Sequence, residues 1–377
     1  MKVAVYAICL NEKAFATRFV EACREADYIV VADTGSTDGC PEALRAAGAT
    51  VHEIKVSPWR FDDARNAALA LVPQDVDVCL SLDLDEILRP GWRSVLEAGW
   101  TPETTRAYYT FVGSHTPDGG DGVTFFNNRM HARHGYRWRH ICHEGIYPDR
   151  TNEHFTWLTD IRVDHWPDET KSRSSYLGLL AAAVAEEPND ARMAHYYGRE
   201  LYYRRDWGPS LEQFQRYLKI GDDGLTGERA ASMVYAARCL DGLERRDEAM
   251  QWRYRAVGEC PGRREVWVEL AEALYKRQDW PGCYGAARTA LSIAQNTGGY
   301  MTEPQAWGFS AHDLASIAAW NIGLRNESLE HAERALALAP DDKRLSNNVD
   351  LIRAAVQPAS KAADAAVADA AQDSAAP

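Results

Sequence analysis

Short apolar runs typical of β-strands alternate with amphipathic helical runs between Met1 and about Trp166, and this alternation constrains the fold more than any other feature. Buried strands separated by helices predict a mostly parallel sheet covered on both faces, so we expect an α/β domain here. In such sheets ligands bind beyond the carboxyl ends of the strands. The expected strands are Lys2–Leu10, Tyr28–Ala32, Val51–Val56 and Val76–Leu82, and the expected helices are Ala14–Ala26, Cys40–Ala47 and Asp62–Leu71.

From about Ser172 to Leu351 the strand signals disappear, and helical runs rich in Ala, Leu, Tyr and Trp replace them. Ala236 and Leu270 lie about 34 residues apart, which is the period of tetratricopeptide helix pairs. We therefore predict an α/β domain over residues 1–170, an all-α domain of tetratricopeptide-like repeats over 171–355 and a disordered Ala- and Asp-rich tail over 356–377. Four polar segments separate the helical runs: Arg205-Asp206-Trp207, Arg246-Asp247-Glu248, Gln278-Asp279-Trp280 and Arg325-Asn326-Glu327.

Charge and cysteine content limit the partners and the compartment. The net charge of -13 is spread along the chain, which argues against nucleic acid as a partner but leaves a locally basic site open. The eight cysteines form no CxxC pair, as is typical of a reducing cytosol. No signal peptide and no membrane-spanning apolar stretch are visible, so we predict a cytoplasmic protein without a membrane span. Its oligomeric state stays open.

Polar clusters follow three of the expected strands at the point where each strand ends. Asn11-Glu12 follows the first strand, Asp33 to Gly39 follows the second, and Asp83 to Glu86 follows the strand at Val76–Leu82. Asp83 and Asp85 straddle one residue, so both carboxylates can point to the same side. Two hard oxygen ligands suit Mg²⁺ or Mn²⁺, which would stabilise a departing nucleoside diphosphate. A solvated acidic turn is the structural alternative.

Taken together, these motifs resemble the family 2 glycosyltransferases of GT-A fold. The subgroup that includes the sublancin-type peptide S-glycosyltransferases often appends tetratricopeptide-like helices. The resemblance covers Met1 to about Trp166 and implies an inverting transfer of a sugar from a nucleotide-sugar. The matching segments are Asn11-Glu12, Asp33-x-Gly-Ser-Thr-Asp38, Asp83-x-Asp85, Trp59 to Asn66, Cys142-His143-Glu144 and Val163-Asp164-His165.

The resemblance also implies a role for each matching residue. Asp85 would bind the metal, with His165 and Asp83 as further ligands. Glu144 would be the catalytic base that takes the proton of the acceptor, with Asp164 and Glu86 as alternatives. For Glu144, an ion pair with a neighbouring arginine is the structural interpretation. The implied donor-binding residues are Asn11, Glu12, Asp33, Ser36, Asp38, Arg65 and Asp83.

A basic, histidine-rich stretch runs from Arg129 to His143 in this acidic chain. We expect it to form a loop that faces the phosphates or the acceptor, and a separate zinc site is the alternative. Its members are Arg129, His131, Arg133, His134, Arg137, Arg139, His140 and His143.

The reaction expected from these features is hexosyl transfer from a UDP-sugar, with UDP-glucose as the default donor, to a peptide or protein, because helical solenoids present long grooves to extended chains. A saccharide, a lipid-linked core or a modified base in DNA are alternative acceptors. A non-catalytic scaffold that binds nucleotide-sugars is an alternative of another class. A nucleotidyltransferase is disfavoured, because Leu10-Asn11-Glu12-Lys13 stands where such enzymes carry a Gly-rich loop for the triphosphate.

Overall fold

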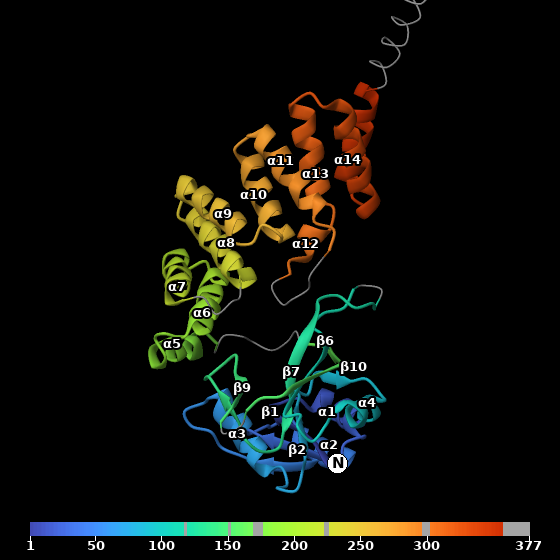
Figure 1. Ribbon diagram of the computed structural model, residues 1–377, viewed down its shortest axis with the longest axis vertical. Coiled ribbons are helices and arrows are strands. Elements are labelled where there is room, and N and C mark those ends of the chain that lie inside the picture. Colours follow the sequence, from blue (N-terminus) through green and yellow to red (C-terminus); the bar gives the residue numbers. More distant parts are fainter. Residues whose placement is uncertain (117–118, 150–151, 169–175, 222–225, 296–301, 357–377) are drawn as a thin grey trace, which may run out of the picture. The chain divides into compact units, whose positions relative to one another are not determined.

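The computed structural model describes residues 1–116, 119–149, 152–168, 176–221, 226–295 and 302–356. The described residues form two compact units, one within Met1–Glu200 and the other from Leu201 onward (Figure 1). The domain boundary expected between residues 170 and 171 lies outside the described residues, as does the tail expected beyond residue 356.

An eight-stranded, mostly parallel sheet forms the centre of the first unit, with strand order β3-β2-β1-β4-β7-β6-β10-β5. Only β7 and β5 run antiparallel to the strands beside them. A separate two-stranded ribbon joins β8 and β9. The strands are β1 (Val3–Cys9), β2 (Tyr28–Asp33), β3 (Thr50–Glu53), β4 (Val78–Ser81), β5 (Glu86–Leu88), β6 (Arg106–Val112), β7 (Thr124–Ala132), β8 (Tyr136–Arg139), β9 (Gly145–Pro148) and β10 (Phe155–His165). The helices that begin in this unit are α1 (Lys13–Cys23), α2 (Cys40–Ala47), α3 (Phe61–Leu71), α4 (Trp92–Gly99), α5 (Tyr176–Glu186) and α6 (Ala191–Tyr203).

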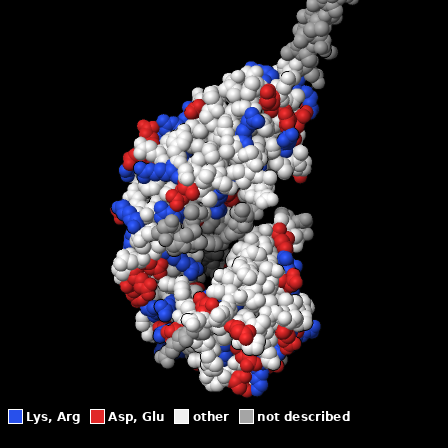
Figure 2. Space-filling model, in the orientation of Figure 1, with Lys and Arg blue, Asp and Glu red and all other residues white. Residues whose placement is uncertain are grey.

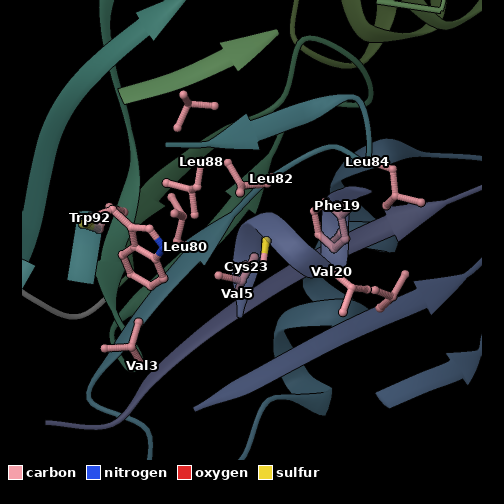
Figure 3. Packing of buried hydrophobic residues seen from close by; sticks show 14 of the residues in the cluster. Val3, Val5, Phe19, Val20, Cys23, Leu80, Leu82, Leu84, Leu88 and Trp92 are labelled. Atoms are coloured by element: carbon pink, nitrogen blue, oxygen red, sulfur yellow. The ribbon is translucent and has the colours of Figure 1, made fainter. Parts of the chain in front are cut away.

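Strand β1 is buried along its whole length because helices cover both faces of the sheet. Val3 and Val5 point to the face covered by α1, α2 and α4, where they join the core cluster of Phe19 (Figure 3). Tyr6 points to the opposite face and packs with Ala68 of α3. Burial of a large apolar side chain stabilises the fold by about 1.5–3 kcal/mol. The apolar run therefore produces a central strand with two buried faces, as the sequence predicts.

The helices of the second unit stack in succession as antiparallel pairs (Figure 1). The turns between paired helices share one geometry. Arg205, Glu244, Gln278 and Gly323 adopt positive φ, and in each turn the following N–H donates to the carbonyl five residues earlier. This is the Schellman arrangement that ends a helix. The helices are α7 (Trp207–Ile220), α8 (Thr226–Gly242), α9 (Arg246–Glu259), α10 (Arg264–Lys276), α11 (Trp280–Ser292), α12 (Pro304–Trp307), α13 (Ser310–Asn321) and α14 (Arg325–Leu338), and residues 343–356 are also helical.

Each of the four predicted separators coincides with the start of a helix, so the expected order of α/β sheet and then helical repeats is confirmed. Acidic and basic side chains are interspersed on the visible face of the molecule (Figure 2). Among the described residues, every helix is too short or too polar to cross a lipid bilayer.

Candidate active site

The three polar clusters meet at one edge of the sheet. Strands β2, β1 and β4 are parallel neighbours, and the register pairs Cys9 with Asp33 and Tyr6 with Ser81. The residues that follow these strands therefore emerge side by side at the carboxyl ends. This is the position where open α/β sheets bind ligands.

Asp33 closes the turn after β2 as an ionised carboxylate. Its Oδ2 accepts hydrogen bonds from the N–H groups of Gly35 and Ser36, both at 3.0 Å, and its Oδ1 accepts one from the Cys9 thiol at 3.3 Å. Burial acts to raise the pKa of Asp33, but the hydrogen bonds from Ser36, Gly35 and Cys9 hold that pKa below its usual value. The carboxylate is 2% exposed and keeps its negative charge at neutral pH.

Asn11, Ser36 and Asp38 join the loop after β1 to the loop after β2. The N–H of Asn11 donates to Ser36 Oγ at 2.8 Å, and Asn11 Oδ1 accepts from the N–H of Thr37 at 2.7 Å. Asp38 accepts from the N–H of Lys13 at 2.9 Å. These polar side chains shape the wall of the site, and Glu12 of the same loop is buried.

Arg65 lies at the centre of the site, and its side chain is 4% exposed. It donates to Asp83 Oδ1 at 2.6 Å, to Glu144 Oε1 at 2.5 Å and to Ser81 Oγ at 3.2 Å. Its guanidinium also lies 4.9 Å from the centre of the Trp138 ring. The next residue, Asn66, forms two 2.9 Å hydrogen bonds with the backbone of Trp138. The Ala-Arg-Asn segment thus carries two functions, because Arg65 reaches the carboxylates while Asn66 fixes β8.

A second arginine, Arg129 of β7, binds Asp83 from the other side. Its Nη1 lies 3.2 Å from Asp83 Oδ2 and 3.4 Å from Glu86 Oε1, and Glu86 Oε2 accepts the N–H of Asp83 at 3.0 Å. Burial acts to raise the pKa of Asp83, yet Arg65 and Arg129 hold it well below its usual value. Burial raises the pKa of Glu86 to about 7, with a further contribution from the charge of Asp83. Both oxygens of Asp83 are therefore engaged by arginines.

Asp85 and His165 converge next to this network. The pairing of β5 with β10 places His165 opposite Glu86, and His165 Nε2 lies 3.4 Å from Asp85 Oδ2. Neighbouring ligand atoms around a metal with bonds of about 2.1 Å lie roughly 3 Å apart, so the pair fits a divalent cation. Burial acts to lower the pKa of His165, but Asp85 outweighs it and raises that pKa. Of the three metal ligands expected from the sequence, Asp85 and His165 lie close enough together to share a cation. The third, Asp83, forms ion pairs with Arg65 and Arg129.

Each of the three candidate bases contacts an arginine, and Glu86 has the contact with Arg129 described above. Glu144 pairs with Arg65, and its side chain is 8% exposed. Asp164 pairs with Arg89 through both of its oxygens, at 2.7 and 2.8 Å. A proton acceptor at either position would share its carboxylate with a guanidinium. Glu144 therefore forms the ion pair with an arginine that is its structural interpretation from the sequence, and the partner is Arg65.

The basic stretch is not one loop, which corrects the expectation from the sequence. The stretch spans β7 and β8 because its alternating pattern suits strands, and its histidines separate. His131 is buried, and its Nε2 forms a hydrogen bond of 3.0 Å with the Tyr6 hydroxyl. His140 Nδ1 lies 3.1 Å from Asp190 Oδ2. His143 stacks on Tyr196 with ring centres 3.8 Å apart. Of this stretch, only Arg129 contacts the carboxylates of Asp83 and Glu86. Nothing in the sequence around Arg129 predicts that contact.

Two further groups of described residues have ligand atoms close enough to share a metal ion, His115 with Asp121 and Asp164, and His140 with Glu187 and Asp190. In the first group, arginines neutralise the carboxylates, since Arg89 pairs with both and Arg162 pairs with Asp121. Neither group includes Asp85 or His165, so neither is the site expected from the sequence.

Comparison with known proteins gives distant similarity to two kinds of protein. No family model matches the chain. The lipopolysaccharide core biosynthesis glycosyltransferase LpsC of Rhizobium meliloti (strain 1021) is 28% identical over 257 residues, which cover 63% of this chain and 89% of that protein. A TPR repeat-containing protein of Synechococcus elongatus is 25% identical over 292 residues, covering 72% of this chain and 70% of that protein.

Similar solved structures include MamA, at 12% identity and a TM-score of 0.36 over 45% of this chain and 89% of that one. Another is YrrB, described as a TPR protein with an unusual peptide-binding site, at 15% identity and a TM-score of 0.36 over 45% of this chain and 80% of that one. The chain is thus distantly similar to a glycosyltransferase and to TPR proteins.

Proposed function

We propose that the chain is a metal-dependent glycosyltransferase that uses a nucleotide-sugar donor. The observation that carries the proposal is the convergence of Asp85 and His165 beside the Asp83 carboxylate, at the carboxyl ends of the parallel strands. The similarity to LpsC supports sugar transfer as the reaction. A sugar leaves its nucleotide as the bond to a diphosphate breaks, and negative charge then develops on the phosphate oxygens.

Asp85 and His165 would hold Mg²⁺ or Mn²⁺. When bound, such a cation supplies the positive charge that stabilises the departing diphosphate. Asp83, fixed by Arg65 and Arg129, presents a rigid carboxylate that can accept hydrogen bonds from the donor. Asp33 and the buried Glu12 would bind the nucleoside, and Asn11, Ser36 and Asp38 would hold the two loops around it.

Inversion at the anomeric carbon requires a base for the acceptor proton. Glu144 is the first candidate because it lies in the same ion-pair network as Asp83, and Asp164 is the second. Glu86 is buried and contacts Arg129 and the backbone of Asp83, which suits a positioning residue better than a base.

The acceptor is proposed to be a peptide or protein, because the helical repeats offer an extended surface. A saccharide acceptor is the second candidate, and the similarity to LpsC, a glycosyltransferase of lipopolysaccharide core biosynthesis, favours it. The TPR relative keeps a scaffold role as the alternative of another class.

The test is release of nucleoside diphosphate from a panel of UDP-, GDP- and dTDP-sugars, with Mn²⁺ or with EDTA. Wild type and Asp85→Ala are compared, first alone and then with peptide and oligosaccharide acceptors. Metal-dependent release from one donor, lost in the variant and stimulated by one acceptor class, would support the proposal and identify both substrates. Binding of a nucleotide-sugar without release under any condition would favour the scaffold.

A further inference from the structure

His140, Glu187 and Asp190 form a group of metal-ligating side chains in the first unit that the proposed reaction does not use. Their ligand atoms all lie within 4.8 Å of one another. His140 Nδ1 lies 3.1 Å from Asp190 Oδ2 and 3.8 Å from Glu187 Oε2. Around a tetrahedral cation with bonds of about 2.0–2.1 Å, neighbouring ligand atoms lie roughly 3.3 Å apart. The two measured distances bracket this value, and the Glu187 side chain is 61% exposed, so it can rotate to close the longer one.

The two carboxylates of this group have no cationic partner other than the histidine. Among the described residues, no arginine or lysine pairs with Glu187 or Asp190, whereas Arg89 and Arg162 neutralise the carboxylates of the other group. The side chains of His140 and Asp190 are only 11% and 12% exposed. Charges removed from water are normally paired or bound to a metal. A divalent cation would neutralise both carboxylates, which a single imidazole cannot do.

Hydrogen bonds outside the group hold two of its ligands in orientation. His140 Nε2 is hydrogen-bonded to the Tyr147 hydroxyl at 3.0 Å, which turns Nδ1 toward the carboxylates. Asp190 Oδ1 accepts the N–H of Met193 at 3.0 Å at the start of α6, and its Oδ2 faces His140. Metal-binding histidines almost always have such a partner on the second ring nitrogen. The two buried ligands are therefore already positioned for a cation.

We propose that His140, Glu187 and Asp190 bind Zn²⁺, with water as the fourth ligand. An imidazole nitrogen combined with carboxylate oxygens favours zinc over Mg²⁺ and Ca²⁺, which prefer oxygen ligands alone. The site connects the segment after β8, which contains Glu144, to the turn between α5 and α6. Apolar residues of the same segment pack on these two helices. Zinc fixes this segment on the helices, a structural role that is separate from the cation at Asp85 and does not depend on sugar transfer.

The test is calorimetric titration of Zn²⁺ into the metal-free, full-length chain, in an Asp85→Asn background that removes the cation of the candidate active site. Glu187→Gln removes one ligand at an exposed position, and Tyr147→Phe removes only the hydroxyl that orients the histidine. Glu186→Gln is the matched control, because Glu186 is the neighbouring exposed acid and pairs with Arg60. Circular dichroism of each variant checks that it folds.

Loss of an outer partner of a metal ligand weakens metal binding by roughly tenfold to a hundredfold, and loss of a ligand by at least as much. We expect Zn²⁺ binding in the Asp85→Asn background, at least tenfold weaker binding after Glu187→Gln or Tyr147→Phe, and unchanged affinity after Glu186→Gln. Zn²⁺ should also slow amide hydrogen exchange of residues 140–146 in the background protein, measured by mass spectrometry.

Three results would overturn the zinc site. Equal Zn²⁺ affinities with and without Glu187→Gln and Tyr147→Phe would mean that the histidine forms only an ion pair with Asp190. An equal loss of affinity in Glu186→Gln would mean that the acidic surface attracts the cation without a defined site. Hydrogen exchange of residues 140–146 that does not respond to Zn²⁺ would exclude the structural role.

Discussion

Arg65→Met is expected to destabilise the first unit strongly, because it leaves a buried carboxylate without its counter-ion. Glu144 is 8% exposed at its side chain, and Arg65 is the arginine paired with it. Removal of one partner from a buried ion pair costs about 3–5 kcal/mol. Asp83 contributes less to this cost, because its side chain is 34% exposed and keeps Arg129. The loss is large compared with the roughly 5–15 kcal/mol of stability of a typical domain.

Urea unfolding followed by circular dichroism measures this effect, with the double variant Arg65→Met/Glu144→Gln beside the single one. In the double variant the neutral amide of Gln replaces the unpaired, buried carboxylate of Glu144. About half of the lost stability should therefore return. The control is Arg45→Met, whose exposed pair with Glu53 should cost less than about 1 kcal/mol. A cost below about 1 kcal/mol for Arg65→Met, or no recovery in the double variant, would show that Glu144 does not depend on Arg65 as its counter-ion.

Three further predictions follow from other parts of the molecule. Asp85→Asn should lower Mn²⁺ affinity at least tenfold by calorimetry, while Asp63→Asn, at an exposed acid of α3, should leave it unchanged; equal affinities would exclude Asp85 as a ligand. Burial lowers the pKa of His131 to about 3, so as the pH falls the unfolded chain protonates this histidine before the folded chain does. Its contribution to stability should therefore be complete above about pH 6.5 and be lost toward pH 3, by up to about 1.4 kcal/mol per pH unit. Urea unfolding at two pH values should show a shallower fall for His131→Asn, and an identical fall would contradict the assignment. Gly323 has φ 86° with open space around it, so Gly323→Ala should cost about 1 kcal/mol through backbone strain alone, while Gln278→Gly at φ 58° should gain about 0.5–1 kcal/mol. Thermal unfolding checks both signs, and two neutral substitutions would count against the shared turn geometry.

The order of strands and helices follows from local patterns that the sequence displays directly. An all-apolar run such as β1 has to be covered on both faces, and polar segments with Asp or Asn next to the helix start mark each turn of the repeats. The meeting of Asp33 and Asp83 at one edge also follows, because parallel strands present their carboxyl ends together.

The partners of those carboxylates could not be predicted in the same way. Arg129 reaches Asp83 because β7 inserts antiparallel between β4 and β6, and the register of that insertion depends on tertiary packing. The pairing of Glu144 with Arg65 spans 79 residues and depends on how the β8–β9 ribbon packs on α3. The basic stretch forms strands rather than a loop, because its residues alternate between the buried and the exposed side of the chain.

Metal-dependent sugar transfer is tested by the rate of nucleoside diphosphate release from the preferred nucleotide-sugar. The rate is measured with Mn²⁺ and with EDTA for wild type, Asp85→Ala, His165→Ala and Asp63→Asn. We expect release by wild type and Asp63→Asn only when metal is present, and a loss of at least a hundredfold in the Asp85 and His165 variants. Release that is unaffected by EDTA and by both substitutions would contradict a metal-dependent transferase centred on Asp85 and His165.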